Sequence, residues 1–283
     1  MCRLKFWFSF LFLVAFPYFS LAQDLGFAIE RYKGESSYIV SNQTQTLKSK
    51  LVFPFEFDTL GVYSDWQHKD IDYQIQLSTL IKDSVSVGRD YDWRNDNLSI
   101  FSNSNSNVEG FLKVDLEVTK PTSKYNAIFA KVGYQQLDLL WSDTRQEDFV
   151  ANTTSQLNGS TLKYEQKFYQ LNLGISHHSY ISKSVDIRVR PSIIFAYIES
   201  KDSHLLRNFY TIQNNIVNGY GINVELNKRV TPTDNISVYF DYEYYKDTNS
   251  DMYYYYNSGV KQTLPASYKH SNRIFGVSYQ YQF

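Results

Sequence analysis

The sequence predicts an all-β protein, a transmembrane antiparallel β-barrel of about ten strands with long extracellular loops. The first observation is the presence of 25 Tyr, 20 Phe and 4 Trp residues in a chain whose mean hydropathy is only −0.41. The second is that apolar and polar side chains alternate with period 2 in many segments, the last of which ends at Phe283. Membrane barrels combine these features because alternate residues face lipid and aromatic residues gather at the two interfaces.

The alternating segments carry charges on their polar face. Between residues 112 and 118, four aliphatic side chains alternate with Lys113, Asp115 and Glu117. A barrel accommodates such a pattern because acids and bases can pair in its lumen, and ring closure satisfies every backbone polar group in lipid. We expect strands near residues 27–40, 48–64, 70–83, 108–119, 125–141, 162–177, 184–200, 217–228, 235–246 and 272–283.

The connections between these strands alternate in length. The short ones lie near residues 65–69, 120–124, 178–183 and 229–234, and the long ones near 84–107, 142–161, 201–216 and 247–271. Short turns of outer-membrane barrels face the periplasm and long loops face the exterior. We therefore expect both termini in the periplasm and, because a barrel this narrow has little interior space, a filled lumen rather than an open pore.

The N-terminus has the pattern of a cleaved signal peptide. Arg3 and Lys5 precede an apolar stretch, residues 6–19, which is followed by the small-x-small site Ser20-Leu21-Ala22. We expect residues 1–22 to be the signal peptide and residues 23–283 the barrel domain. The single cysteine, Cys2, lies in the signal, which excludes disulfides, zinc-thiolate sites and a cysteine nucleophile from the mature chain.

The charge balance gives no indication of a nucleic-acid partner. With 28 Lys and Arg residues against 29 Asp and Glu residues, the formal net charge is −1, and nucleic-acid-binding domains carry a basic excess. Outer-membrane lipid is the expected surroundings, and a monomer is the default for this architecture.

Two short acidic motifs stand out in the predicted long loops. Asp90-Tyr91-Asp92 follows the third strand, and Asp202-Ser203-His204 follows the seventh, so both belong at the extracellular rim. Two carboxylates held close together cannot both ionise cheaply, so one pKa rises. A histidine beside a carboxylate suits a general base near neutral pH. Together, Asp90, Asp92, Asp202 and His204 could activate a water molecule, although either motif alone is most often a solvated loop.

With these motifs the chain resembles the omptins, a family of outer-membrane aspartyl-histidine endopeptidases with a ten-stranded barrel. The segment Gly88–Trp93 resembles the Asp-x-Asp-Trp signature of the family, and Asp202–His204 resembles its Asp-x-His motif. Val132–Gln135 and Tyr164–Phe168 also match family segments in the right order. The resemblance covers most of the mature chain at low identity.

The resemblance implies an endopeptidase that hydrolyses peptide bonds at the cell surface through activated water, without a covalent intermediate or a metal. It implies that Asp90, Asp92, Asp202 and His204 are catalytic, with Glu35 as a substrate-binding acid that favours cationic peptides. Ser200 replaces a second acid of the family. No cofactor is expected apart from lipopolysaccharide, on which omptin activity depends; Tyr134 and Lys167 match parts of that binding cluster, whereas Gln136 and Asp138 depart from it.

Two other functions remain open. A non-catalytic barrel of the same ancestry could act as an adhesin or a surface structural protein, which the altered specificity positions favour. A different barrel, such as a channel or a lipid-modifying enzyme, is less consistent with the sequence. No motif places a serine beside His204, and a filled lumen disfavours a channel.

Overall fold

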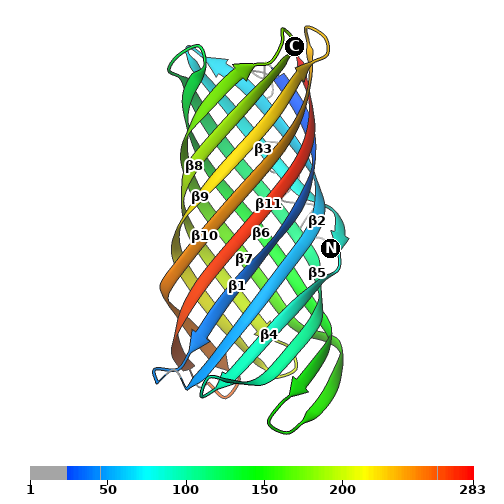
Figure 1. Ribbon diagram of the computed structural model, residues 1–283, viewed down its shortest axis with the longest axis vertical. Coiled ribbons are helices and arrows are strands. Elements are labelled where there is room, and N and C mark those ends of the chain that lie inside the picture. The colour runs from blue at the N-terminus through cyan, green and yellow to red at the C-terminus, as the bar shows by residue number, and fades with distance from the viewer. Residues whose placement is uncertain (1–23, 45, 260) are drawn as a thin grey trace.

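The computed structural model describes residues 24–44, 46–259 and 261–283, so the expected signal peptide lies outside the described residues. Within these ranges no helix is long and apolar enough to cross a membrane. The strands tilt around one closed barrel (Figure 1). They are β1 (Asp24–Ser41), β2 (Leu47–His68), β3 (Ile71–Ser84), β4 (Ser86–Arg94), β5 (Asn97–Pro121), β6 (Asn126–Asp148), β7 (Thr153–Tyr180), β8 (Val185–His204), β9 (Phe209–Arg229), β10 (Asp234–Tyr256) and β11 (Lys261–Gln282).

The strands form one antiparallel ring, which confirms the predicted fold class. β1 pairs with β2 on one side and with β11 on the other, so the described sheet closes on itself. β3 and β4 both pair with β2 and β5 and are separated by Val85 alone, so they share one position in the ring. The eleven segments therefore occupy ten positions, which agrees with the strand count expected from the alternation.

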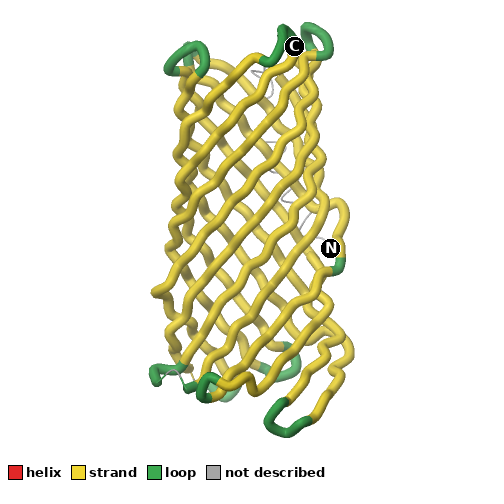
Figure 2. Tube along the Cα trace, in the orientation of Figure 1, coloured by secondary structure: helices red, strands yellow, loops and turns green. Residues whose placement is uncertain are grey.

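The segments expected as long loops are largely paired strands. β4 and the first half of β5 form one hairpin, and the ends of β6 and β7, β8 and β9, and β10 and β11 form others. Tight turns therefore connect neighbouring strands at both ends of the barrel (Figure 2). These hairpins are rich in polar residues, as in the run Ser102–Asn107 of β5, so the strands continue beyond the lipid-facing zone. We call the end with the chain's C-terminus the terminal end and the opposite end the hairpin end.

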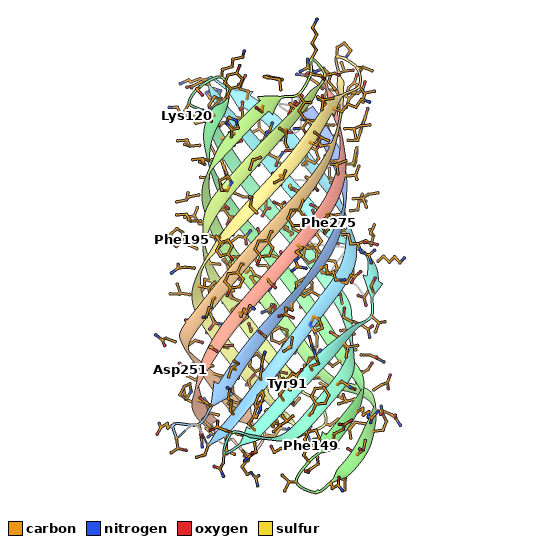
Figure 3. The ribbon with its side chains drawn as sticks, viewed as in Figure 1. Tyr91, Lys120, Phe149, Phe195, Asp251 and Phe275 are labelled. Atoms are coloured by element: carbon orange, nitrogen blue, oxygen red, sulfur yellow. The ribbon has the colours of Figure 1, made fainter. Side chains whose placement is uncertain are left out.

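An apolar belt surrounds the part of the barrel nearer the terminal end. Its outward side chains are exposed and lie side by side across the strands, as in the row Ile29, Val277 and Val238. Figure 3 shows Phe195 and Phe275 on this outer surface. Tyrosines border the belt toward the hairpin end, where the rings of Tyr169 and Tyr197 are 6.1 Å apart. Such a belt with an aromatic border is the surface that a lipid bilayer requires of a barrel.

The lumen inside the belt is polar and charged, as the alternation predicts. Lys113 and Lys131 bind Asp115 at 3.3 and 3.6 Å, and Arg190 forms an ion pair with Glu117. These groups line a cavity of about 660 Å³ that extends to the turns of the terminal end. Pairing offsets the cost of removing each charge from water.

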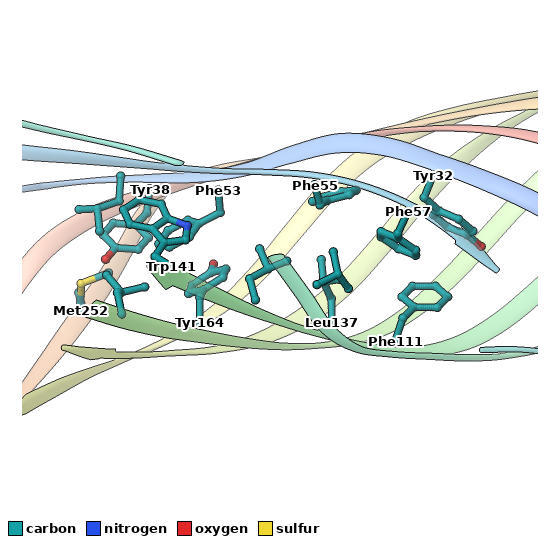
Figure 4. Packing of buried hydrophobic residues seen from close by; sticks show 14 of the residues in the cluster. Tyr32, Tyr38, Phe53, Phe55, Phe57, Phe111, Leu137, Trp141, Tyr164 and Met252 are labelled. Carbon is teal, nitrogen blue, oxygen red and sulfur yellow. The ribbon is translucent and has the colours of Figure 1, made fainter. Parts of the chain in front are cut away.

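A cluster of aromatic and aliphatic side chains, which we call the aromatic plug, fills the lumen between this cavity and the hairpin end (Figure 4). Its main members are Tyr32, Phe53, Phe55, Phe57, Phe111, Leu137, Leu139, Trp141 and Tyr164, all nearly or fully buried. The rings of Phe53 and Tyr164 stack at 3.9 Å, and those of Tyr32 and Phe57 at 4.9 Å. The plug gives the barrel a packed core in place of an open channel.

An arginine in the middle of the belt should destabilise the barrel. We expect Val277→Arg to lower the free energy of unfolding in lipid vesicles by about 2–4 kcal/mol, because the guanidinium would face the bilayer midplane. Asn214→Arg is the matched control, since Asn214 is outward-facing and exposed on β9 beyond the belt. Urea titration of refolded protein would measure both. Equal costs for the two variants would show that the belt does not face lipid.

Candidate functional site

The two acidic motifs lie in paired strands at the hairpin end, not in loops. Asp90 and Asp92 belong to β4, where Asp92 pairs with Ile100 across the hairpin. His204 is the last residue of β8, and Asp202 lies two residues before it. His204 pairs with Phe209 at the start of β9. Strand geometry points residues two apart to the same side, so each motif presents both side chains together.

The site lies beyond the apolar belt. On β8 the outward apolar side chains end at Tyr197, and the next outward residues are Glu199 and Lys201. On β7 they end at Tyr169, which is followed toward the hairpin end by Lys167. Asp202 and His204 come after this transition, so water, and not lipid, surrounds the barrel at their level.

Asp202 and His204 form a buried pair that a tyrosine holds in place. Nε2 of His204 lies 3.3 Å from Oδ2 of Asp202, and the side chains are 15% and 1% exposed. The hydroxyl of Tyr38, on β1, donates a hydrogen bond to the same carboxylate oxygen. Tyr38 is itself buried against Phe53 and Tyr164 of the aromatic plug. Packing therefore fixes the carboxylate, and the carboxylate orients the imidazole.

The pKa of His204 lies above its ordinary value, which is the net result of opposing effects. Burial lowers this pKa, but the negative charge of Asp202 and the hydrogen bond to it raise the pKa by more. Arg207 lowers the pKa of His204 and Asp90 raises it, both by smaller amounts. With Nε2 occupied by Asp202, Nδ1 is the nitrogen that remains to take a proton. This arrangement is that of an oriented general base.

Asp90 is held close to this pair. Burial and the neighbouring charge of Asp92 raise the pKa of Asp90 to about 7, and the charges of His204 and Asp202 also act on it. The hydroxyl of Ser49 donates to Oδ1 of Asp90 at 3.4 Å. The ring therefore brings the Asp-x-Asp and Asp-x-His motifs together from strands more than 100 residues apart in the sequence.

Tyr254 is a fifth member of the site that the sequence reasoning missed. Burial raises the pKa of Tyr254 most, and the charges of Asp202, Asp90 and Asp92 add to this effect, so its phenol lies near these carboxyl groups. In the sequence it is one of four consecutive tyrosines, Tyr253–Tyr256, and nothing in the run distinguishes it from its neighbours. Tyr38 was also missed, because nothing in the sequence indicates which tyrosine of β1 faces β8.

The structure does not bring Glu35 to these residues. Along β1, Glu30, Tyr32 and Tyr38 face the lumen, which places the odd-numbered Glu35 on the outer side of the strand. Its carboxylate lies 4.0 Å from Arg89, which also points outward between Asp90 and Gly88. The expected substrate-binding acid is therefore an outer-surface residue whose charge is partly neutralised.

Tyr134 and Lys167 share one patch on the outer surface at the border of the belt. Tyr134 pairs across strands with Tyr169, their rings 5.4 Å apart, and Lys167 pairs with Gln136. Tyr134 donates to Gln136 at 3.2 Å, and the Gln136 amide donates to Asp138 at 3.0 Å. The two residues expected at a lipid headgroup are thus neighbours, with a carboxylate beside them.

Among residues 24–44, 46–259 and 261–283, no group of three or more His, Cys, Asp and Glu side chains has an arrangement that could hold a metal ion. The site offers three carboxyl groups, one imidazole and the phenols of Tyr38 and Tyr254.

Comparison with known proteins supports the fold. The chain is similar to the outer membrane protease OmpT from Escherichia coli, with a TM-score of 0.78 at 14% identity over 93% of this chain and 97% of that one. It is less similar to the transport unit of the autotransporter AIDA-I from Escherichia coli (TM-score 0.42, 10% identity, 92% and 90% covered). For the translocator domain of the autotransporter NalP from Neisseria meningitidis, the TM-score is 0.41 at 10% identity, and 100% of each chain is covered. No protein-family model and no curated protein matches the chain. The likeness to OmpT shows an outer-membrane β-barrel fold.

Replacing Asp202 with Asn should lower the pKa of His204 below that of an ordinary histidine. The change removes the charge that raises the pKa, while burial and the positive charge of Arg207, which lower it, remain. NMR titration of histidine-labelled protein in detergent would measure this, with the His204 signal assigned by its loss in His204→Ala. Asp251→Asn, on the outer face of β10, should leave the pKa unchanged. An unchanged pKa in Asp202→Asn would mean that the pair does not form.

Proposed function

We propose that this outer-membrane barrel is an omptin-like endopeptidase that hydrolyses peptide bonds at the cell surface. The observation that carries the proposal is the buried Asp202–His204 pair, 3.3 Å apart, with Asp90 close enough that Asp90 and His204 shift each other's pKa. The site lies at the hairpin end, and we infer that this end faces outside. The likeness to OmpT supports the fold that this proposal needs.

The proposed reaction uses a water molecule bound between Asp90 and His204. The imidazole of His204 takes a proton from the water while the water oxygen attacks the peptide carbonyl carbon. Asp202 stabilises the imidazolium that forms. The C–N bond of the resulting tetrahedral species then breaks, and His204 returns the proton to the leaving amine. Asp90 orients the water, and burial together with the charge of Asp92 raises the pKa of Asp90 to about 7.

Cationic peptides are the proposed substrates. Asp90, Asp92 and Asp202 gather three carboxyl groups at one end of the barrel, and an acidic opening attracts positively charged ligands. The outward position of Glu35 leaves these residues, and not Glu35, as the proposed source of that attraction.

Replacing His204 with Ala should reduce kcat/KM for a cationic peptide by about a hundredfold or more, because the general base is lost. A fluorogenic peptide assay on protein refolded in detergent would measure the rate. His177→Ala is the matched control: His177 is exposed at the terminal end, where it bonds Asn126. If His204→Ala cleaves as fast as wild type, this mechanism is wrong.

The proposal is best tested with a peptide library of varied central residues, with and without lipopolysaccharide. Cleavage by wild type that disappears in Asp90→Ala would support the endopeptidase. No cleavage by correctly folded wild type, even with lipid, would favour a non-catalytic barrel that acts as an adhesin or surface structural protein.

Lipopolysaccharide should raise the activity of wild type by binding at the patch of Tyr134 and Lys167. The ammonium of Lys167 is the group that would pair with a lipid phosphate, although Asp138 nearby opposes it. We expect Lys167→Ala to need more lipid for half-maximal activity, while Lys228→Ala, exposed near the terminal end, behaves as wild type. A lipid titration of peptide cleavage would show this. Identical titrations for wild type and Lys167→Ala would place the lipid elsewhere.

A further inference from the structure

One side of the space around His204 is lined by aromatic rings. Phe209 stacks on the imidazole, with ring centroids 4.1 Å apart and planes at 19°. The ring of Tyr254 lies 6.0 Å from Phe209, that of Tyr256 lies 5.6 Å from it, and the two tyrosines are 6.4 Å apart. Phe209 and Tyr254 are partly buried, whereas Tyr256 is 36% exposed. The rings therefore form a wall from the proposed base toward solvent.

A β-bulge in β10 directs the two tyrosines inward. In the first part of β10 the odd-numbered residues face the lumen, as the buried Glu243 and Tyr245 show. The pairing with β11 shifts between Asp247 and Ser250, and beyond this point the even-numbered Met252 is buried. Bulges often re-aim side chains beside functional sites. Without the shift, Tyr254 and Tyr256 would face outward, as Tyr253 does.

The surroundings of this wall favour an uncharged substrate side chain. Ser200, two residues before Asp202, is buried and accepts hydrogen bonds from Tyr164 and Gln166 at 3.4 Å, so the position is neutral and satisfied. Arg207, in the turn directly after His204, adds a positive charge that lowers the pKa of both His204 and Asp90. A basic side chain bound on this side would meet Arg207 and find no acid at Ser200, which offsets its attraction to the carboxylates near Tyr254. Contact with the rings then decides which side chain is preferred.

We propose that Phe209, Tyr254 and Tyr256 form a substrate subsite that takes an aromatic or large aliphatic side chain adjacent to the scissile bond. This inference rests on the proposed endopeptidase function and names its substrate class more narrowly. A cationic peptide is drawn to the acids of the opening, and cleavage occurs where an apolar side chain enters the aromatic wall.

The physical basis is burial of apolar surface against rings that are already in place. Offset-stacked and edge-to-face ring pairs have centroids about 4.5–7 Å apart and add stability beyond area burial. A hydrophobic pocket discriminates between side chains that differ by a methylene by roughly 10–200-fold, so a comparable range is expected between a benzyl group and a methyl group.

The test uses full-length mature protein in detergent with lipopolysaccharide and peptides with identical cationic flanks. In one set of peptides the residue before the scissile bond is varied, and in a second set the residue after it. The varied residue is Phe, Leu, Ala, Lys or Asp, and kcat/KM is measured for each peptide. For wild type we expect a Phe-to-Ala ratio of about tenfold or more. Tyr256→Ala should reduce this ratio several-fold, whereas Tyr253→Ala, its outward neighbour on the same strand, should keep it. Circular dichroism and the shift in gel mobility on folding would verify that each variant folds.

Three results would overturn the inference, and they differ in what they say about the enzyme. Efficient cleavage with Lys preferred, or with no preference, would reject the aromatic subsite while leaving the endopeptidase intact. An equal loss of the Phe-to-Ala ratio in Tyr256→Ala and Tyr253→Ala would reject the assignment to the inward wall. Absence of any cleavage by folded wild type would reject the subsite together with the proposed function.

Discussion

Closure of the ring is the constraint on which the rest of the structure depends. In lipid every backbone amide and carbonyl needs a partner, and the pairing of β1 with both β2 and β11 provides it. Once the ring is closed, the register of each strand determines which residues lie at the same height. Tyr38 from β1, Asp90 from β4, Asp202 from β8 and Tyr254 from β10 meet because of that register, although no two of them are close in sequence.

The interior changes character along the barrel axis. Paired charges such as Lys113 and Asp115 line the cavity inside the belt, the aromatic plug follows, and the residues of the candidate site lie at the hairpin end. This order gives the plug two roles. It packs the lumen, and it removes water from one side of Asp90 and His204. Burial raises the pKa of Asp90, whereas for His204 burial lowers the pKa and the effect of Asp202 outweighs it. The pKa values at the site thus depend on the hydrophobic packing of the adjacent aromatic plug.

Much of this arrangement could be predicted from local pattern. Period-2 alternation predicts the strands and their faces, and two motifs predict which acids and which histidine gather at one end. The outward direction of Glu35 was also readable, because Ile29 fixes the phase of β1 and no bulge interrupts it. The inward direction of Tyr254 could not be predicted from the sequence, because it depends on a bulge that only the pairing with β11 reveals. The paired hairpins were missed because polar residues in strands that leave the bilayer resemble loops.

The plug also bears on how a cell can use such a protein. Phe53, Tyr164 and their neighbours pack ring against ring across the lumen, and the charged cavity ends at this layer. A barrel filled in this way offers solutes no open path through the packed part of its lumen. Each copy in the outer membrane then adds protein without adding a pore.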